Sequence, residues 1–95
     1  METIKNFGYV LASKRLVDEK LSVGFMYRES GSVKDSGWRF FAGDEEQNYV
    51  DNPDNIGVYD VLTILEIDGS IRPYLNAPVG DAYEKDENGR FVLIR

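Results

Sequence analysis

The stretch that decides the fold is SGWRFFAGDEEQNYVDNPDNIGVYD, residues 36–60. Its first part predicts a β-strand over residues 38–42. Side chains alternate along a strand, so Trp38 and Phe40 are expected on one face, with Arg39 and Phe41 on the other. Large aromatic residues on both faces indicate a central strand, or one whose second face is covered by a helix.

The second part, residues 43–60, predicts an irregular acidic loop that ends at a helix cap. Residues 44–49 can form a single helical turn with Asp44 as its N-cap. Pro53 prevents a longer helix, because proline lacks the backbone N–H and constrains the residue before it.

One main helix is predicted after this loop, over about residues 60–68. Asp60 is the candidate N-cap, and apolar residues recur at helical spacing from Val61 to Leu65. Gly69 stands where a C-cap is expected. A helix this short is unstable alone in water, so it is expected to pack on the sheet.

The other predicted strands flank this region. Residues 7–13 form a short apolar run typical of a buried strand, and residues 14–20 form a charged link. In residues 21–27 the alternation predicts an inner face made of Leu21, Val23, Phe25 and Tyr27. Residues 71–78, which contain two prolines, predict an irregular or edge segment.

The C-terminal segment predicts a β-hairpin, because the Asn-Gly dipeptide at residues 88–89 favours a type I′ turn. A two-residue loop pairs Glu87 with Arg90 and Lys85 with Val92. The opposite charges of Glu87 and Arg90 favour this register over a four-residue loop, which would place Lys85 opposite Arg90.

Together these elements predict an α+β fold in a single domain, residues 1–95. The expected architecture is a mainly antiparallel sheet of about five short strands, with one main helix (about residues 60–68) packed on it and a C-terminal β-hairpin.

Composition excludes several kinds of site. The 95 residues include no Cys and no His. The chain therefore has no disulfide, no zinc site built from Cys or His, and no imidazole for nucleophilic or acid–base catalysis. No segment approaches the ~20 apolar residues of a membrane span, so a cytoplasmic protein without membrane contact is expected.

The negative charge is concentrated in one region. The formal net charge is −6, and residues 40–71 contain eight acids and no Lys or Arg. The rest of the chain holds nine acids and eleven bases, so this region accounts for the whole excess. Nucleic acid is disfavoured as a partner because its phosphates would be repelled, and a basic protein is expected instead.

The acidic loop is therefore the predicted partner-binding surface. Its candidate contact residues are Asp44, Glu45, Glu46, Tyr49, Asp51 and Asp54. Tyr49 either contacts the partner, as tyrosines at interface hot spots do, or folds back over the sheet.

Two other uses of the same loop have less support. A calcium loop that starts at Asn52 would place Ile56 at position five, where an oxygen ligand is needed, and Thr63 at position twelve, where a Glu is needed. Paired carboxylates could act as acid and base, but a domain this small has little room for the apolar pocket that raises a carboxyl pKa. We predict no catalytic residue, cofactor or metal; the alternative is a small carboxylate enzyme or a calcium-binding module.

Several motifs carry a resemblance to a known family. They are the SGWRFF strand at residues 36–41, the Gly-Asp-Glu break at residues 43–45, DNPDNIGVYD at residues 51–60 and APVGDAYEKD at residues 77–86. From about Phe7 to its end, the chain resembles a bacterial family first catalogued as a domain of unknown function and later grouped with polymorphic-toxin immunity proteins as immunity protein 33. The resemblance implies a small α+β protein without enzymatic activity that neutralises a cognate toxin by binding it.

Overall fold

The computed structural model of the chain describes residues 8–32 and 34–94. It contains a six-stranded sheet with the strand order β4-β1-β3-β2-β5-β6. The strands are β1 (Tyr9–Ser13), β2 (Phe25–Arg28), β3 (Asp35–Phe41), β4 (Ile56–Asp60), β5 (Ala82–Lys85) and β6 (Phe91–Ile94). The helical segments are α1 (Lys14–Asp18), α2 (Gln47–Val50) and α3 (Val61–Ile67), with two 3-10 segments, η2 (Pro53–Asn55) and η3 (Gly69–Tyr74).

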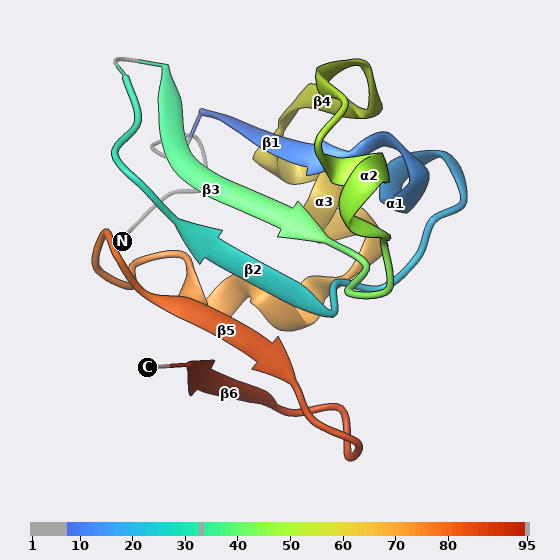
Figure 1. The fold of residues 1–95 in the computed structure, drawn as a ribbon. Coiled ribbons are helices and arrows are strands. Elements are labelled where there is room, and N and C mark those ends of the chain that lie inside the picture. The colour runs from blue at the N-terminus through green and yellow to red at the C-terminus, as the bar shows by residue number, and fades with distance from the viewer. Residues whose placement is uncertain (1–7, 33, 95) are drawn as a thin grey trace.

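The two faces of the sheet are covered unequally (Figure 1). Behind the sheet lie α3 and the segment that follows it, whereas α2 is the helix that stands in front. We call the face that carries α2 the open face. None of the helices in the described ranges has the length and apolarity needed to cross a membrane.

The strand pairing confirms the predicted α+β class and corrects the sheet. β1 and β3 run parallel, whereas the other neighbouring strands are antiparallel. β4 was not predicted, because its residues were assigned to the end of an irregular loop. Its Ile, Val and Tyr side chains favour extended backbone, and it pairs with β1 so that Val58 lies opposite Leu11.

β3 occupies the centre of the sheet, between β1 and β2, as its aromatic residues predicted. Trp38 and Phe40 are fully buried with their rings stacked 5.8 Å apart, and the Trp38 indole N–H donates to the Leu75 carbonyl at 3.1 Å. They belong to the core between the sheet and the helices, which consists of Val10, Ala12, Leu16, Val23, Met26, Trp38, Phe40, Val61, Ile64, Leu65, Ile71 and Leu75.

The predicted inner face of residues 21–27 is wrong in part. Met26 is fully buried in the core, so Phe25 and Tyr27 point to the open face. The error arises at Gly24, where a Cβ atom would lie only 2.1 Å from the Ala42 carbonyl oxygen. Regular alternation starts after this close approach, which lets Val23 enter the core from outside the strand.

The main helix forms as predicted, because the Asp60 carboxylate accepts a hydrogen bond from the Leu62 amide at 2.8 Å. The predicted C-cap at Gly69 is wrong. The helix ends at Ile67 with Asp68 as its C-cap, and the Asp68 carboxylate caps the start of η3 by accepting from the Ser70 amide. The predicted irregular segment thus becomes η3, and it brings Ile71 into the core.

The charged link at residues 14–20 contains an unpredicted helix, α1. Its N-cap is Ser13, whose hydroxyl accepts from the Leu16 amide at 3.1 Å. Leu16 is fully buried and Val17 packs against the core, but two adjacent apolar residues among charged neighbours show no helical periodicity that would have predicted the helix. Of the strand predicted at residues 7–13, Phe7 lies outside the described residues.

The C-terminal hairpin is present in a different register. Lys85 lies opposite Phe91, not Val92, and a three-residue loop is closed by a 2.8 Å hydrogen bond from the Asp86 amide to the Arg90 carbonyl. Gly89, at φ +81°, supplies the left-handed residue that such loops require. The shift by one residue changes the face of every later side chain, so Val92 lies on the open face.

Leu16 provides a test of how α1 packs. Truncation of Leu16 to Ala should lower the free energy of unfolding by about 2–5 kcal/mol, because it removes fully buried methyl groups and leaves a cavity. Leu62→Ala is the matched control, since Leu62 is half exposed on α3 and should change stability by less than about 1 kcal/mol. Urea denaturation measures both, and equal losses would contradict the packing of α1.

Candidate functional site

The acidic segment is held to the sheet by Glu45. One carboxylate oxygen accepts hydrogen bonds from the Ser13 hydroxyl at 2.7 Å and the Ala42 amide at 2.8 Å, and the other accepts from the Gly43 amide at 2.9 Å. Burial opposes ionisation of this carboxyl, but the hydrogen bonds outweigh it and lower the pKa of Glu45. Glu45 therefore fixes the turn after β3.

Asp44 and Tyr49 bind the segment to α1 through Arg15. The Asp44 carboxylate forms an ion pair with the Arg15 guanidinium, and the hydrogen bond from Arg15 lowers the pKa of Asp44. The Tyr49 hydroxyl oxygen accepts from the Arg15 backbone amide at 3.0 Å. The predicted N-cap role of Asp44 is wrong: α2 begins after Glu46, which forms no side-chain cap.

The other three predicted contact residues are exposed: Glu46, Asp51 and Asp54. The Asp51 carboxylate accepts a hydrogen bond from the Gln47 side chain at 2.8 Å. Neither the Glu46 nor the Asp54 carboxylate accepts a hydrogen bond from the described part of the chain. These three groups therefore present the outward charge of the segment, which contains α2 and η2 where an irregular loop was predicted.

Several acids of the region outside this segment have structural roles. Asp60 caps α3. Asp68 forms a 2.8 Å ion pair with Lys85 and accepts from the Val23 amide at 2.9 Å. Burial disfavours its charge, yet these bonds lower the pKa of Asp68 to about 2. The region therefore contains more acidic side chains than the structure leaves free to contact a partner.

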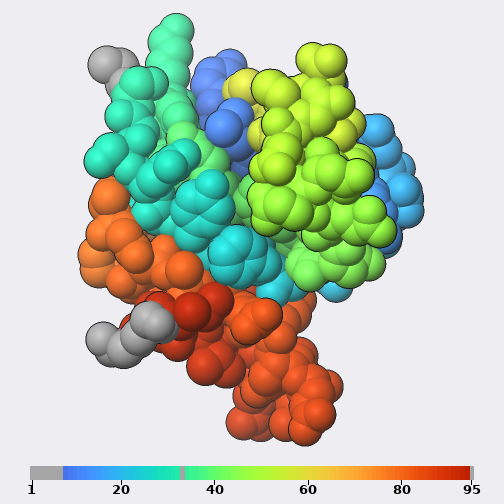
Figure 2. All heavy atoms as spheres, in the orientation of Figure 1, coloured from blue at the N-terminus to red at the C-terminus, as the bar shows by residue number. Residues whose placement is uncertain are grey.

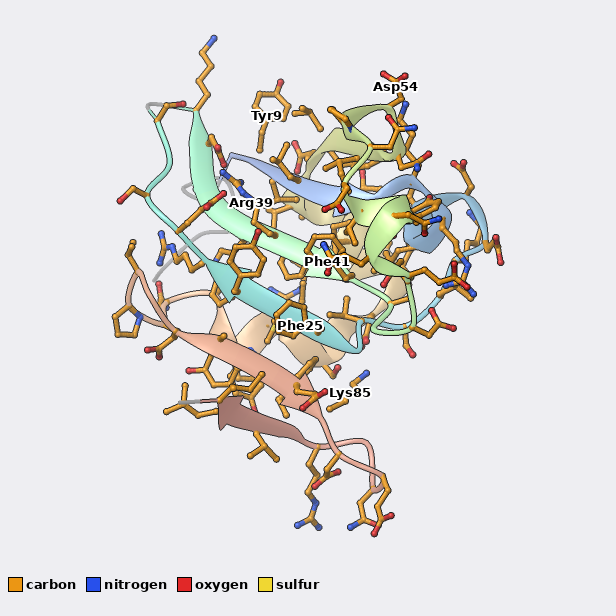
Figure 3. The ribbon with its side chains drawn as sticks, in the orientation of Figure 1. Tyr9, Phe25, Arg39, Phe41, Asp54 and Lys85 are labelled. Carbon is orange, nitrogen blue, oxygen red and sulfur yellow. The ribbon has the colours of Figure 1, made fainter. Side chains whose placement is uncertain are left out.

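A pocket of about 490 Å³ lies between α2 and the open face of the sheet. Its floor contains the rings of Phe25, Tyr27 and Phe41, with centroids 5.8–6.2 Å apart. Figure 3 shows Phe25 and Phe41 on this face, and in Figure 2 the side chains of β2 and α2 lie on either side of the hollow. Three carboxylates stand at its border, those of Glu29, Asp51 and Glu84.

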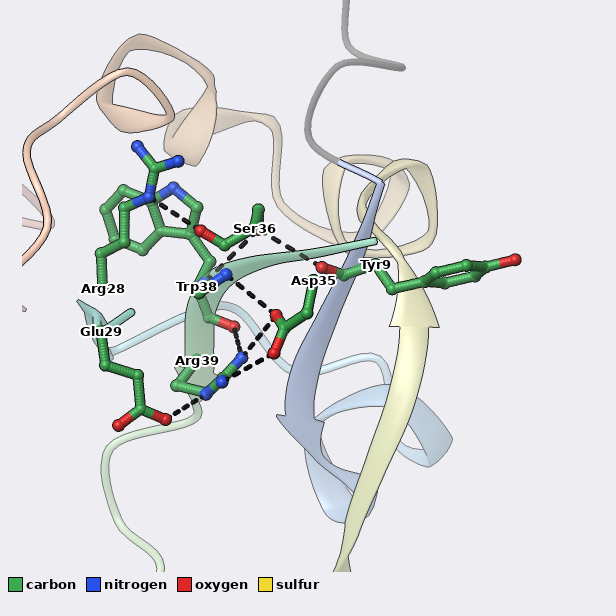
Figure 4. A network of polar contacts seen from close by, with 8 residues as sticks. Tyr9, Arg28, Glu29, Asp35, Ser36, Trp38 and Arg39 are labelled. Carbon is green, nitrogen blue, oxygen red and sulfur yellow. Dashed lines mark hydrogen bonds and ion pairs between the residues drawn. The ribbon is translucent and has the colours of Figure 1, made fainter. Parts of the chain in front are cut away.

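The positive charge in this floor is already satisfied. Arg39 has a buried guanidinium that donates two hydrogen bonds to Asp35, both at 2.9 Å, one to Glu29 at 2.6 Å and one to the Trp38 carbonyl (Figure 4). The hydrogen bonds from Arg39 also lower the pKa of Asp35. Four of its five N–H groups are thus bonded, and two carboxylates offset its charge, so Arg39 joins β3 to the residue that follows β2 and has little attraction left for an anionic ligand.

The sequence predictions did not identify this aromatic floor. Phe25 and Tyr27 were assigned to an inner face, and Phe41 was placed on the second face of its strand without a binding role. A signal was present in the aromatic residues on both faces of β3, which required a cover for each face. It could not show that the second cover, α2, would leave part of the floor exposed.

The acidic side chains of the described residues were also candidates for a metal site or for acid–base chemistry. Within residues 8–32 and 34–94, no group of three acids could hold a metal ion. A carboxylic general acid at neutral pH needs a raised pKa. Hydrogen bonds from arginine lower the pKa of Asp35 and of Asp44. Burial alone would raise the pKa of Glu45 and of Asp68, but their hydrogen bonds outweigh burial and lower both pKa values.

Glu45→Gln tests whether this carboxylate holds the acidic segment. The NH2 group of the glutamine side chain cannot accept a hydrogen bond from the donors that now bind the carboxylate. At pH 7 the variant should therefore lose about 1–3 kcal/mol in free energy of unfolding. Because folding lowers the pKa of Glu45, its contribution is complete above its ordinary value of 4.5 and is lost as pH falls through the folded value.

The difference between the wild-type protein and Glu45→Gln should therefore shrink between pH 5 and pH 3, as measured by urea denaturation. Glu46 is next to it in the chain, and the Glu46 carboxylate accepts no hydrogen bond from the described residues. Glu46→Gln should therefore leave stability within about 0.5 kcal/mol at either pH. A loss at Glu45 that does not change with pH would contradict the assigned role of its charge.

Comparison with known proteins identifies the family. The sequence model described as the Immunity protein Imm33 domain matches residues 10–95, from β1 through β6. Searches of curated proteins and of solved structures found no match. Since the match covers most of the chain, the protein belongs to the Imm33 family of immunity proteins.

Proposed function

We propose that this chain neutralises a cognate bacterial toxin by binding it in the cytoplasm, without catalysing a reaction. Membership of an immunity-protein family supports the general role. The observation that carries the proposed mechanism is the set of exposed carboxylates, Glu46, Asp51 and Asp54, on a segment fixed to the sheet.

The proposed partner is a basic protein. The Glu46 and Asp54 side chains are exposed and their carboxylates accept no hydrogen bond within the described ranges, so a cationic surface can approach them without displacing an internal bond. Opposite charge also accelerates association, which suits an inhibitor that must capture a toxin within the same compartment.

Rigidity of the segment adds to this argument. A charged loop that had to be ordered on binding would lose affinity through conformational entropy. Here Glu45 binds the backbone at the end of β3, and Tyr49 and Asp44 bind α1. We propose that these three residues position the surface, whereas Glu46, Asp51 and Asp54 contact the partner.

A charge-reversal pair tests the proposed surface. In the test variant Glu46→Lys is combined with Asp54→Lys, two carboxylates without a structural bond. The probe is a toxin domain identified among the genes that neighbour the gene for this chain. We expect its Kd to rise about 10- to 100-fold, mainly through slower association, and the salt dependence of binding to decrease.

The matched control combines Glu66→Lys with Glu87→Lys. Both residues are exposed, and the net charge changes by the same amount away from α2. This variant should bind within about 3-fold of wild type. If the test variant folds normally and keeps the wild-type Kd and salt dependence, the acidic segment is not the interface. Failure of the wild-type chain to bind the toxin domain would refute the immunity role itself.

A further inference from the structure

We propose that the pocket between α2 and the open face of the sheet receives a lysine or arginine side chain of the toxin, with the aliphatic stem and cationic head lying on the rings of Phe25, Tyr27 and Phe41. This inference rests on the proposed function and adds a second, aromatic contact site beside the acidic segment.

The floor has the chemistry that such a side chain requires. Tyr27 and Phe41 stack at an interplanar angle of 10°, and Phe25 lies against both rings. Aromatic faces attract cations held within about 6 Å, most strongly where water is excluded. The rings also accept the methylene stem of a long basic side chain. A pocket of about 490 Å³ is within the size range of ligand sites in proteins.

The border of the pocket selects for positive charge. Glu84 lies opposite Phe25 on β5 and is exposed, and Asp51 projects from α2 on the other side. Glu29 shares one oxygen with Arg39 but keeps about half of its side chain exposed. With the charge of Arg39 neutralised by Asp35 and Glu29, the carboxylates that remain give this border a negative potential.

The same charges argue against other occupants. An anionic ligand would be repelled by the border, and the charge of the Arg39 guanidinium is already offset by Asp35 and Glu29. A second copy of this chain would bring its own acidic border against the first. The open face does carry exposed apolar residues beyond the pocket, Val58 and Val92, which could widen the contact with a protein partner.

Two single substitutions test the pocket against the toxin domain. Phe25→Leu removes a ring but keeps apolar volume; it should raise Kd about 5- to 10-fold, chiefly through faster dissociation. Glu84→Lys places a like charge at the border and should raise Kd at least about 10-fold. Both effects should persist at 0.5 M salt, where long-range steering is screened.

Matched controls lie on β6 and in the loop between β5 and β6. Phe91→Leu removes an aromatic ring from the opposite face of the sheet, where Phe91 packs against Tyr74. Glu87→Lys reverses a charge in the loop after β5. Both variants should bind within about 3-fold of wild type, and thermal melting confirms that all four variants are folded.

A double-mutant cycle identifies the inserted side chain. Each Lys and Arg of the toxin domain is replaced with Ala and measured against wild type and Glu84→Gln. One basic residue should show a coupling of about 5-fold or more with Glu84, whereas steering would spread small effects over many residues.

Each alternative outcome is distinct. If the charge pair Glu46→Lys, Asp54→Lys weakens binding but Phe25→Leu and Glu84→Lys do not, the pocket is not a contact site and the proposed function stands. If the wild-type chain does not bind the toxin domain, both proposals fail. Dimerisation of the chain in sedimentation experiments, abolished by Glu84→Lys, would show that a second copy occupies this face and would overturn the inference.

Discussion

The rest of the structure depends on a constraint set by β3, a central strand with large apolar side chains on both of its faces. Trp38 and Phe40 are covered by the layer that contains α3 and η3. On the other side, Arg39 is satisfied by Asp35 and Glu29, and Phe41 joins a cluster of aromatic rings. The cover on this side is a short helix that Glu45 holds in place. One face thus becomes a closed core and the other a partly open pocket, because the second cover is too small to close it.

The acidic region combines structural and exposed charge. Where a carboxylate has backbone amides or a cation as partners, as at Glu45 and Asp68, its charge stabilises the fold and its pKa is low. Where it has none among the described residues, as at Glu46 and Asp54, its charge contributes to the field that a partner meets. These two kinds of carboxylate explain how so acidic a segment can be ordered. Hydrogen-bond donors and cations within the fold offset the repulsion between the bonded carboxylates, and the other carboxylates are exposed to water.

Much of the fold follows from local signals. The central strand, the α+β class and the helix capped by Asp60 were predictable because each depends on residues adjacent in sequence. The errors occur where a distant contact or a backbone conformation decides the outcome: the close approach at Gly24 reversed the expected face of β2, and the left-handed Gly89 set the hairpin register. In the candidate site, the exposed charges were visible in the sequence. The bracing role of Glu45 and the aromatic floor were not, because both join residues that the chain order separates.

The position of β1 has a consequence for synthesis. β1 is made first, yet its neighbours in the sheet are β3 and β4, and β2 likewise lies between β3 and β5. A nascent chain that has exposed only its first two strands therefore has no sheet to form, and pairing between distant strands slows folding further. The edge strand β6 is the last of the six strands in chain order, and its neighbour in the sheet is β5. For a protein with an immunity role, protection would then come from finished molecules accumulated before the toxin arrives, since chains still being translated lack the assembled surface.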